Sequence, residues 1–263
     1  MDKITSIQNP RIKQILQLTK NRERREQGLV AMEGARELGL ALDAGYKLET
    51  VYLCNEVFTK SEYPEIINRI DKEKIIEISH IVFNKLAYRE NSDGILALIK
   101  PKNHSLESLT LSDNPFIIVL ESVEKPGNLG AILRTADAAK ADAVIICDPN
   151  TDIYNPNVIR SSVGCIFTVN IGIANSGETH EWLKTKNIKS YAAELRASSW
   201  YHEKDFTKPS AIIMGTEADG LTDFWLDNAD ERIKIPMRGK IDSLNVSVST
   251  AILTFEAMRQ RGF

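Results

Sequence analysis

The chain has 263 residues, of which 43% are hydrophobic and 26% charged, and its formal net charge is −3. The length favours two domains, and the composition is that of a globular protein able to bury a sizeable core. The small acidic balance excludes a protein that is basic all over, so any contact with nucleic acid must use a local basic region.

Several broad classes are disfavoured as well. The three cysteines, Cys54, Cys147 and Cys165, lie far apart and are odd in number, which argues against a disulfide framework and favours a reducing compartment. No charged-then-apolar leader opens the chain, and no apolar run approaches the length of a membrane span. The four histidines are scattered without zinc-type spacing. We therefore expect a cytoplasmic protein without a metal centre or membrane contact.

The first part of the chain predicts a small α/β domain. Residues 1–27 are basic and helix-prone; charge alone favours a solvated helix face, and an arm that contacts phosphates is the alternative. Strand-like and helical runs then alternate up to "GILALIK" (94–100). The polar, proline-bounded stretch 101–115 is the best linker candidate. We place the first domain at 1–104, the linker at 105–115 and the second domain at 116–263.

The second part predicts a parallel sheet covered by helices on both faces, because apolar strands are separated by helical segments. The expected strands include "FIIVLESV", "AVIIC", "SYAAEL", "AIIMG" and "RIKIP", and a long helix is expected from about 246 to 260. Ligands gather at the carboxyl ends of the strands in such sheets. Three loops that follow these strands are therefore candidate parts of one site.

The first candidate loop opens "EKPGNLGAILRTADAA" (124–139). Asn128 is well placed to cap the following helix. Arg134 lies off the apolar side of that helix, and it is either a functional residue or a surface arginine paired with Asp137. Helical spacing predicts a buried stripe made of Leu129, Ile132, Leu133 and Ala136.

The second loop, in "IIMGTEADGLT" (212–222), has the glycine spacing of a phosphate loop. Leu221, however, stands where such a loop needs a lysine, and "GNLG" in the first loop is not the dinucleotide signature G-x-G-x-x-G. A nucleotide-dependent hydrolase or oxidoreductase is therefore disfavoured, and no G-x-S-x-G elbow indicates a serine hydrolase. The polar residue left over is Glu217, which is either functional or an ordinary turn acid.

The third loop lies in "IPMRGKIDSLNVSVSTAILTFEAMRQ" (235–260). Ser243 or Asn245 can cap the helix that follows, which leaves the other residue free for another role. The apolar spacing in this helix predicts a buried stripe made of Val248, Ala251, Ile252 and Phe255.

In order and spacing, "PGNLGAILRTA" (126–136), "MGTEADGL" (214–221) and "IPMRGKIDSLNVSVSTA" (235–251) resemble the three motifs of the SpoU/TrmH family of RNA 2′-O-ribose methyltransferases, in the SPOUT superfamily. "NPNVIRSSVG" (155–164) is similar to a less diagnostic fourth stretch, although Val163 and Cys165 depart from the usual small residues. "AMEGARELGLAL" (31–42) and "GILALI" (94–99) resemble the substrate-binding domain of the family.

The resemblance implies an α/β fold whose C-terminal parallel-sheet domain carries a trefoil knot, preceded by a small α/β RNA-binding domain. It also implies S-adenosylmethionine as methyl donor, RNA as acceptor with ribosomal RNA favoured over tRNA, and a homodimer with its active site at the subunit boundary. A tRNA 2′-O-methyltransferase and a non-catalytic RNA- or ribosome-binding protein are the alternatives.

Site residues follow from the same resemblance. A guanidinium keeps its proton at ordinary pH, so Arg134 is expected to stabilise the reacting oxygen rather than act as a base. The residues expected in catalysis are Asn128, Arg134, Glu217, Ser243 and Asn245. The residues expected around the donor are Gly215, Glu217, Ile235, Met237 and Leu244. The basic N-terminal arm, rather than a family motif, indicates the RNA contacts, and the residues expected to make them are Arg22, Arg24, Arg25, Arg36 and Arg89.

Overall fold

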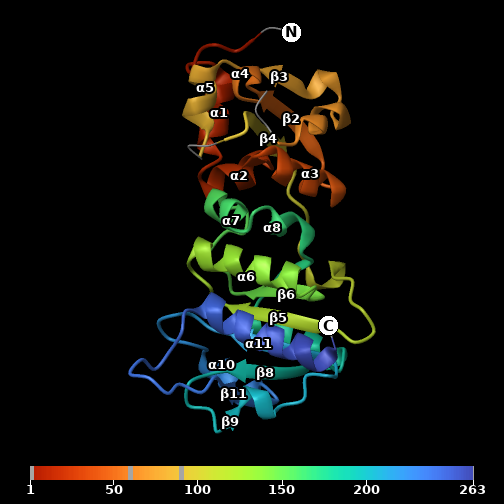
Figure 1. Ribbon diagram of the computed structural model, residues 1–263, viewed down its shortest axis with the longest axis vertical. Helices are drawn as coiled ribbons and strands as arrows, with labels where there is room; N and C mark the ends of the chain where they lie inside the picture. The colour runs from red at the N-terminus through yellow and green to blue at the C-terminus, as the bar shows by residue number, and fades with distance from the viewer. Residues whose placement is uncertain (1–2, 59–61, 89–91, 263) are drawn as a thin grey trace. The chain divides into compact units, whose positions relative to one another are not determined.

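The computed structural model describes residues 3–58, 62–88 and 92–262. The chain forms two compact units, one from residues 1–102 and 153–168 and the other from residues 103–152 and 169–263 (Figure 1). Each unit has its own sheet. Within the described residues, no helix has both the length and the apolar character needed to cross a bilayer.

The first unit is built on a mixed four-stranded sheet in the order β1-β4-β2-β3. Strand β4 runs antiparallel to β1 and β2, and β2 runs parallel to β3. The strands are β1 (Val30–Glu33), β2 (Leu48–Leu53), β3 (Ile75–Glu77) and β4 (Ile95–Ile99). The helices are α1 (Pro10–Gln17), α2 (Asn21–Gln27), α3 (Ala35–Asp43), α4 (Asn55–Phe58), α5 (His80–Leu86) and the 3₁₀ turns η1 (Pro64–Arg69) and η2 (Lys72–Lys74). The predicted small α/β domain is confirmed.

Residues 153–168 pack in the first unit although the sequence places them in the second domain. This segment contains α7 (Pro156–Ser161) and α8 (Cys165–Thr168). The Tyr46 ring meets the rings of Tyr154 and Phe167 edge-on. Gly164 has a φ of +85°, and a Cβ there would lie 2.8 Å from a methyl of Leu40, so this approach requires glycine. The domain boundaries drawn from the sequence stay a prediction.

The second unit contains the predicted parallel sheet, seven strands in the order β7-β6-β5-β10-β8-β11-β9. Every neighbouring pair is parallel, which confirms the prediction. The strands are β5 (Phe116–Glu121), β6 (Ala143–Cys147), β7 (Ile171–Ala174), β8 (Lys189–Ala193), β9 (Ser199–Trp200), β10 (Ser210–Met214) and β11 (Glu231–Lys234). The short edge strand β9 was not predicted. The trefoil knot stays a prediction.

Helices cover this sheet on both sides, because its strands are apolar on both faces. Buried residues of α9 (Ser176–Thr185) and α10 (Asp223–Asn228) join one core, together with η3 (Leu106–Ser108). Leu109 and Leu111 pack against the same core, so these residues of the predicted linker belong to the second unit. The helices α6 (Pro126–Ala138) and α11 (Val246–Arg261) contact each other and the strands β5, β6 and β10 (Figure 1).

The two predicted helix stripes differ in outcome. All four apolar residues of the α6 stripe are buried, as predicted. The α11 stripe was wrong, because Val248 and Phe255 are 47% and 40% exposed. Helix α11 is apolar on more than one side, and it packs inward with a different set of residues. The buried residues of α11 are Val246, Thr250, Leu253, Thr254 and Ala257.

Candidate active site

The three candidate loops leave the same edge of the sheet of the second unit. Strand β10 pairs with β5 and β8, and β8 pairs with β11, all in parallel. The loops that follow β5, β10 and β11 therefore start at the carboxyl edge. Each loop contributes a polar side chain to one cluster.

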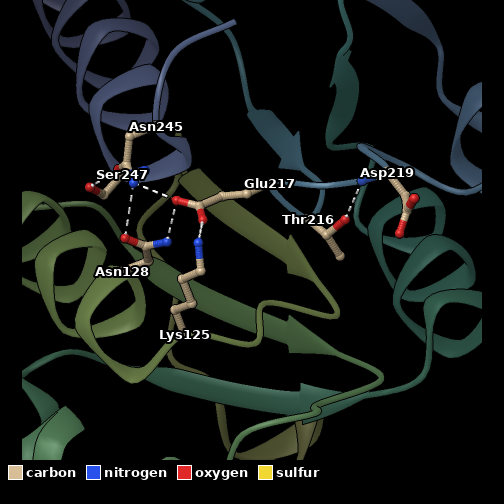
Figure 2. Close-up of polar contacts among 7 residues, drawn as sticks. All are labelled: Lys125, Asn128, Thr216, Glu217, Asp219, Asn245 and Ser247. Atoms are coloured by element: carbon tan, nitrogen blue, oxygen red, sulfur yellow. Dashed lines mark hydrogen bonds and ion pairs between the residues drawn. The ribbon is translucent and has the colours of Figure 1, made fainter.

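Glu217 is the centre of that cluster (Figure 2). Its Oε1 accepts hydrogen bonds from Asn128 Nδ2 at 2.7 Å and from Asn245 Nδ2 at 2.5 Å. The two amides also meet each other, because Asn245 Nδ2 lies 3.2 Å from Asn128 Oδ1. Lys125 Nζ forms an ion pair with Glu217 Oε2. The structure thus brings together three of the predicted catalytic residues and adds a lysine.

Local helix chemistry explains how both asparagines reach Glu217. Asn245 caps α11, and its Oδ1 accepts from Ser247 N at 3.0 Å and from Ser247 Oγ at 2.6 Å. This leaves the Nδ2 donor of Asn245 for Glu217. The predicted cap at Asn128 was wrong, because α6 starts at Pro126 with Lys125 as its N-cap. Asn128 is the third residue of α6, three positions after the N-cap, and its side chain donates to Glu217 instead of capping the helix.

The neighbours of Glu217 also fix its charge. The hydrogen bond from Lys125, and then that from Asn128, hold the pKa of the Glu217 carboxyl below its ordinary value. The carboxylate form is therefore the one present at neutral pH. Its two oxygens are satisfied by donors from two other loops, so the cluster keeps Glu217 in one orientation.

A pocket of about 490 Å³ opens beside the cluster. Among its walls are parts of the loops after β8, β10 and β11, and Glu217 belongs both to the pocket and to the cluster. All the residues predicted to surround the donor line it, and so does Ser243, which is exposed and donates to Asp242 Oδ1 at 3.3 Å. The predicted lining residues are Gly215, Glu217, Ile235, Met237 and Leu244.

The two glycines of the second loop, Gly215 and Gly220, are required by the way its backbone folds. A Cβ on Gly215 would lie 2.1 Å from the carbonyl carbon of Gly220 and 2.4 Å from Leu221 N. The loop folds back on itself there, with Thr216 N donating to Gly220 O at 2.9 Å, and Gly220 has a φ of +73°. Asp219 N donates to Thr216 Oγ1 within the same turn (Figure 2). A tight backbone turn beside the pocket thus accounts for the spacing that resembled a phosphate loop.

Arg134 is not part of this cluster. It lies on α6 six residues after Asn128, which is about 9 Å along a helix and on a different side of it. The side chain is exposed and makes no hydrogen bond or ion pair within the described ranges. Its catalytic role stays a prediction.

The basic residues predicted to contact RNA have different environments. Arg22, Arg25 and Arg36 are exposed, and Arg22 forms an ion pair with Glu26. Arg24 needs a correction: it is only 5% exposed, and its Nη1 donates to Leu18 O at 2.6 Å. This guanidinium is buried inside the first unit, where it binds a backbone carbonyl, and it is therefore not available to RNA. Arg89 lies outside the described residues.

Sequence reasoning missed two parts of the site. Lys125 precedes Pro126 as an unremarkable exposed lysine, and nothing local indicates that Glu217 is its partner. Leu195 and Arg196 line the pocket after β8; their position at a carboxyl strand end was the available signal. Within the ranges described, no group of three His, Cys, Asp or Glu side chains is placed to hold a metal ion.

The titration of Glu217 tests the cluster. In the wild-type protein, the carboxyl carbon of Glu217 should titrate at a lower pH than a free glutamate side chain, as followed by NMR. Lys125→Met should move that midpoint upward, because the largest stabilising contact of the carboxylate is lost. Lys85→Met, at an exposed lysine of the first unit, is the control. A midpoint that does not respond to Lys125→Met would refute the charge pairing.

Two family models match this chain, each over a different part of it. The SpoU rRNA Methylase family model matches residues 115–255, and a model described as MRM3-like substrate binding domain matches residues 9–97. The 23S rRNA (guanosine-2′-O-)-methyltransferase RlmB of Escherichia coli (strain K12) is 36% identical over 189 residues, which cover 68% of this chain and 78% of that protein.

Several solved structures match nearly the whole chain, and two of them illustrate the similarity. One is described as an RNA 2′-O ribose methyltransferase and is 39% identical, with a TM-score of 0.87 and 99% of each chain covered. The other is the AdoMet-bound rRNA methyltransferase from Sinorhizobium meliloti, 28% identical, with a TM-score of 0.88, covering 98% of this chain and 97% of that one. Since the family model matches more than half of the chain, and does so across the loops that form the polar cluster and the pocket, this protein belongs to the SpoU rRNA methylase family.

Proposed function

We propose that this protein transfers a methyl group from S-adenosylmethionine to a ribose 2′-hydroxyl of ribosomal RNA. The observation that carries the proposal is the meeting of Asn128, Glu217 and Asn245, from three separate loops, at the edge of one pocket. The names of the relatives support the reaction and the donor, and two of those names specify rRNA.

The pocket suits the proposed donor in size and chemistry. Its volume of about 490 Å³ lies in the range of small-molecule sites. Leu195, Met237 and Leu244 supply apolar walls, while the loop around Gly215 exposes backbone groups without a side chain in the way. Glu217 adds an ionised carboxylate at the rim, which favours a cationic ligand.

When bound, S-adenosylmethionine supplies an electrophilic methyl carbon, whose bond to sulfur breaks as its bond to the ribose O2′ forms, leaving a neutral thioether. The hydroxyl proton passes to water or to the neighbouring phosphate. The protein's task is alignment and charge stabilisation, since positioning alone contributes roughly 7–11 kcal/mol in the best intramolecular reactions. The amides of Asn128 and Asn245, locked by Glu217, fix the loops that border the reacting atoms.

Arg134 has the second role in this scheme. Its guanidinium clamps the phosphate next to the target sugar and stabilises negative charge developing on O2′. The exposure of Arg134, away from the cluster of its own subunit, supports a role in the site of a neighbouring subunit.

A homodimer accounts for this placement. One side of α11 carries Val248, Ala251, Ile252 and Phe255 at helical spacing, a pattern typical of a buried face, although Val248 and Phe255 are exposed and the other two are half-buried. Helix α11 also packs against α6, which carries Arg134. A second copy that covers the apolar side of α11 would therefore approach the arginine as well.

The alternatives carry less support. A non-catalytic RNA-binding protein has no need for an ionised glutamate held by three nitrogen donors beside a pocket. A tRNA substrate is less favoured because the two tRNA-modifying relatives of known structure cover only 57–58% of this chain, whereas the rRNA methyltransferase from Sinorhizobium meliloti covers 98% of it. The predicted cytoplasmic location agrees with three free cysteines.

Arg134 is tested by single-turnover methyl transfer to an unmodified large-subunit rRNA transcript. Arg134→Ala should slow transfer by about 10²–10³-fold while leaving donor affinity unchanged, because one charge-stabilising group is removed. Arg134→Lys should recover only part of the rate, since an ammonium cannot form the planar two-point contact. Full activity of Arg134→Lys would contradict bidentate recognition.

Mixing variants shows whether Arg134 acts across the dimer. Coexpressed Arg134→Ala and Glu217→Gln subunits should regain up to roughly a quarter of wild-type activity, because half of the dimers then contain one intact shared site. Each variant alone is the control. If the mixture stays as inactive as its components, Arg134 acts within its own subunit.

The basic surface of the first unit is tested by charge reversal. Arg22→Glu with Arg25→Glu should weaken RNA binding and reduce the salt slope of the affinity by about one to two, because phosphate contacts are lost. Donor affinity should not change. Lys72→Glu with Lys85→Glu, at two exposed lysines of the same unit, is the control for the change in net charge. Equal weakening by both pairs would contradict a specific role for α2.

A further inference from the structure

Glu121, at the carboxyl end of β5, is a buried carboxylate that the proposed reaction does not use. It is 3% exposed, it does not line the pocket, and it forms no ion pair within the described residues. A buried carboxylate is costly unless other groups compensate for it. Its contacts are therefore informative about what it holds.

The main partner of Glu121 is Thr222, the residue that follows the loop 215–221 of the pocket wall. Thr222 N donates to Glu121 Oε2 at 2.8 Å, and Thr222 Oγ1 donates to Glu121 Oε1 at 2.7 Å. Thr222 directly follows loop 215–221 and is the N-cap residue of α10, although its side chain makes no capping hydrogen bond. The hydroxyl serves Glu121 instead, so both oxygens of the carboxylate are committed to the exit of the loop.

A wider network steadies this contact. Trp225 Nε1, on α10, donates to Ser176 Oγ at 3.1 Å. The single hydroxyl hydrogen of Ser176 is shared between Asp148 Oδ2 at 2.7 Å and Glu121 Oε1 at 3.2 Å. Hydrogen bonds thus connect the starts of α9 and α10 with the end of β5 and with the residue that follows β6.

The segment from the end of β5 to the start of α6 therefore contacts loop 215–221 and the residue after it at two points. Lys125 holds Glu217 near the middle of the loop, and Glu121 holds Thr222 at its end. Between these points, Ser122 N donates to Cys147 O at 2.9 Å, and Ser122 has a φ of +52°, so this short connection is itself fixed.

We infer that Glu121 is a positioning residue for donor binding. It acts through Thr222 to hold the backbone of loop 215–221 in the form that lines the pocket, and it touches neither donor nor RNA. The inference rests on the proposed function, because it assigns the pocket to the methyl donor.

Glu121→Gln is the main test, because it keeps the shape of the side chain and removes its charge and one acceptor. It should weaken S-adenosylmethionine binding by about three- to tenfold in calorimetry, the effect of losing about one such hydrogen bond. Hydrogen exchange of the amides in 215–221 should become faster, and KM for the donor should change more than kcat. Thr222→Val should shift the same readouts less, and Thr222→Ser should behave like wild type.

Asp230→Asn is the matched control. Asp230 Oδ2 also accepts from a backbone amide and a hydroxyl, those of Ser190, each at 2.8 Å, but at the starts of β8 and β11, far from the carboxyl edge. This variant should lower thermal stability without changing donor affinity or exchange in the loop.

Two results would overturn the inference: unchanged donor affinity and loop exchange in Glu121→Gln, or equal loss of donor affinity in Glu121→Gln and Asp230→Asn. Failure of the wild-type protein to bind the donor would instead refute the proposed function. In that case the exchange rates of residues 215–221 still decide whether Glu121 positions the loop.

Discussion

The site depends on one carboxylate that satisfies donors from separate parts of the chain. Glu217 accepts hydrogen bonds from Asn128 and Asn245 and pairs with Lys125. Lys125 and Asn128 lie at the start of α6, and Asn245 lies at the start of α11. These two helices pack against each other. The same contacts lower the pKa of the Glu217 carboxyl, so they fix both the orientation and the charge of this side chain. Without this acceptor, two amides and an ammonium would converge with no partner of opposite charge.

Much of the second unit could be predicted because its signals are local. Buried parallel strands appear as short apolar runs, and the α6 stripe follows the period of a helix. The parallel order then brings the strand ends to one edge, which explains why Glu217 and Asn245 lie together as expected. Arg134 was expected beside them, but the contacts of Glu217 are with Lys125, Asn128 and Asn245. The three motifs carried the assignment of pocket residues, and periodicity alone would not have named Met237 or Leu244.

The errors share a physical origin: the partner of a side chain is a tertiary property. Val248 and Phe255 have the spacing of a core stripe, but the residues of α11 that the structure buries include Thr250 and Thr254. Arg24 belongs to a run of exposed arginines and yet reaches a backbone carbonyl in the interior. A third example is the packing of residues 153–168 in the first unit, where the Phe167 ring meets that of Tyr46 and Gly164 has a positive φ; the predicted domain boundaries themselves stay a prediction. No local pattern indicates any of these choices.

The central claim is that the Glu217 cluster shapes a donor site, and donor calorimetry on the wild-type protein and on Glu217→Gln tests it most directly. The account predicts that the wild type binds S-adenosylmethionine and that the amide variant, which cannot satisfy Lys125, Asn128 and Asn245 together, binds it about tenfold more weakly. Equal affinity of the two proteins for the donor would contradict it.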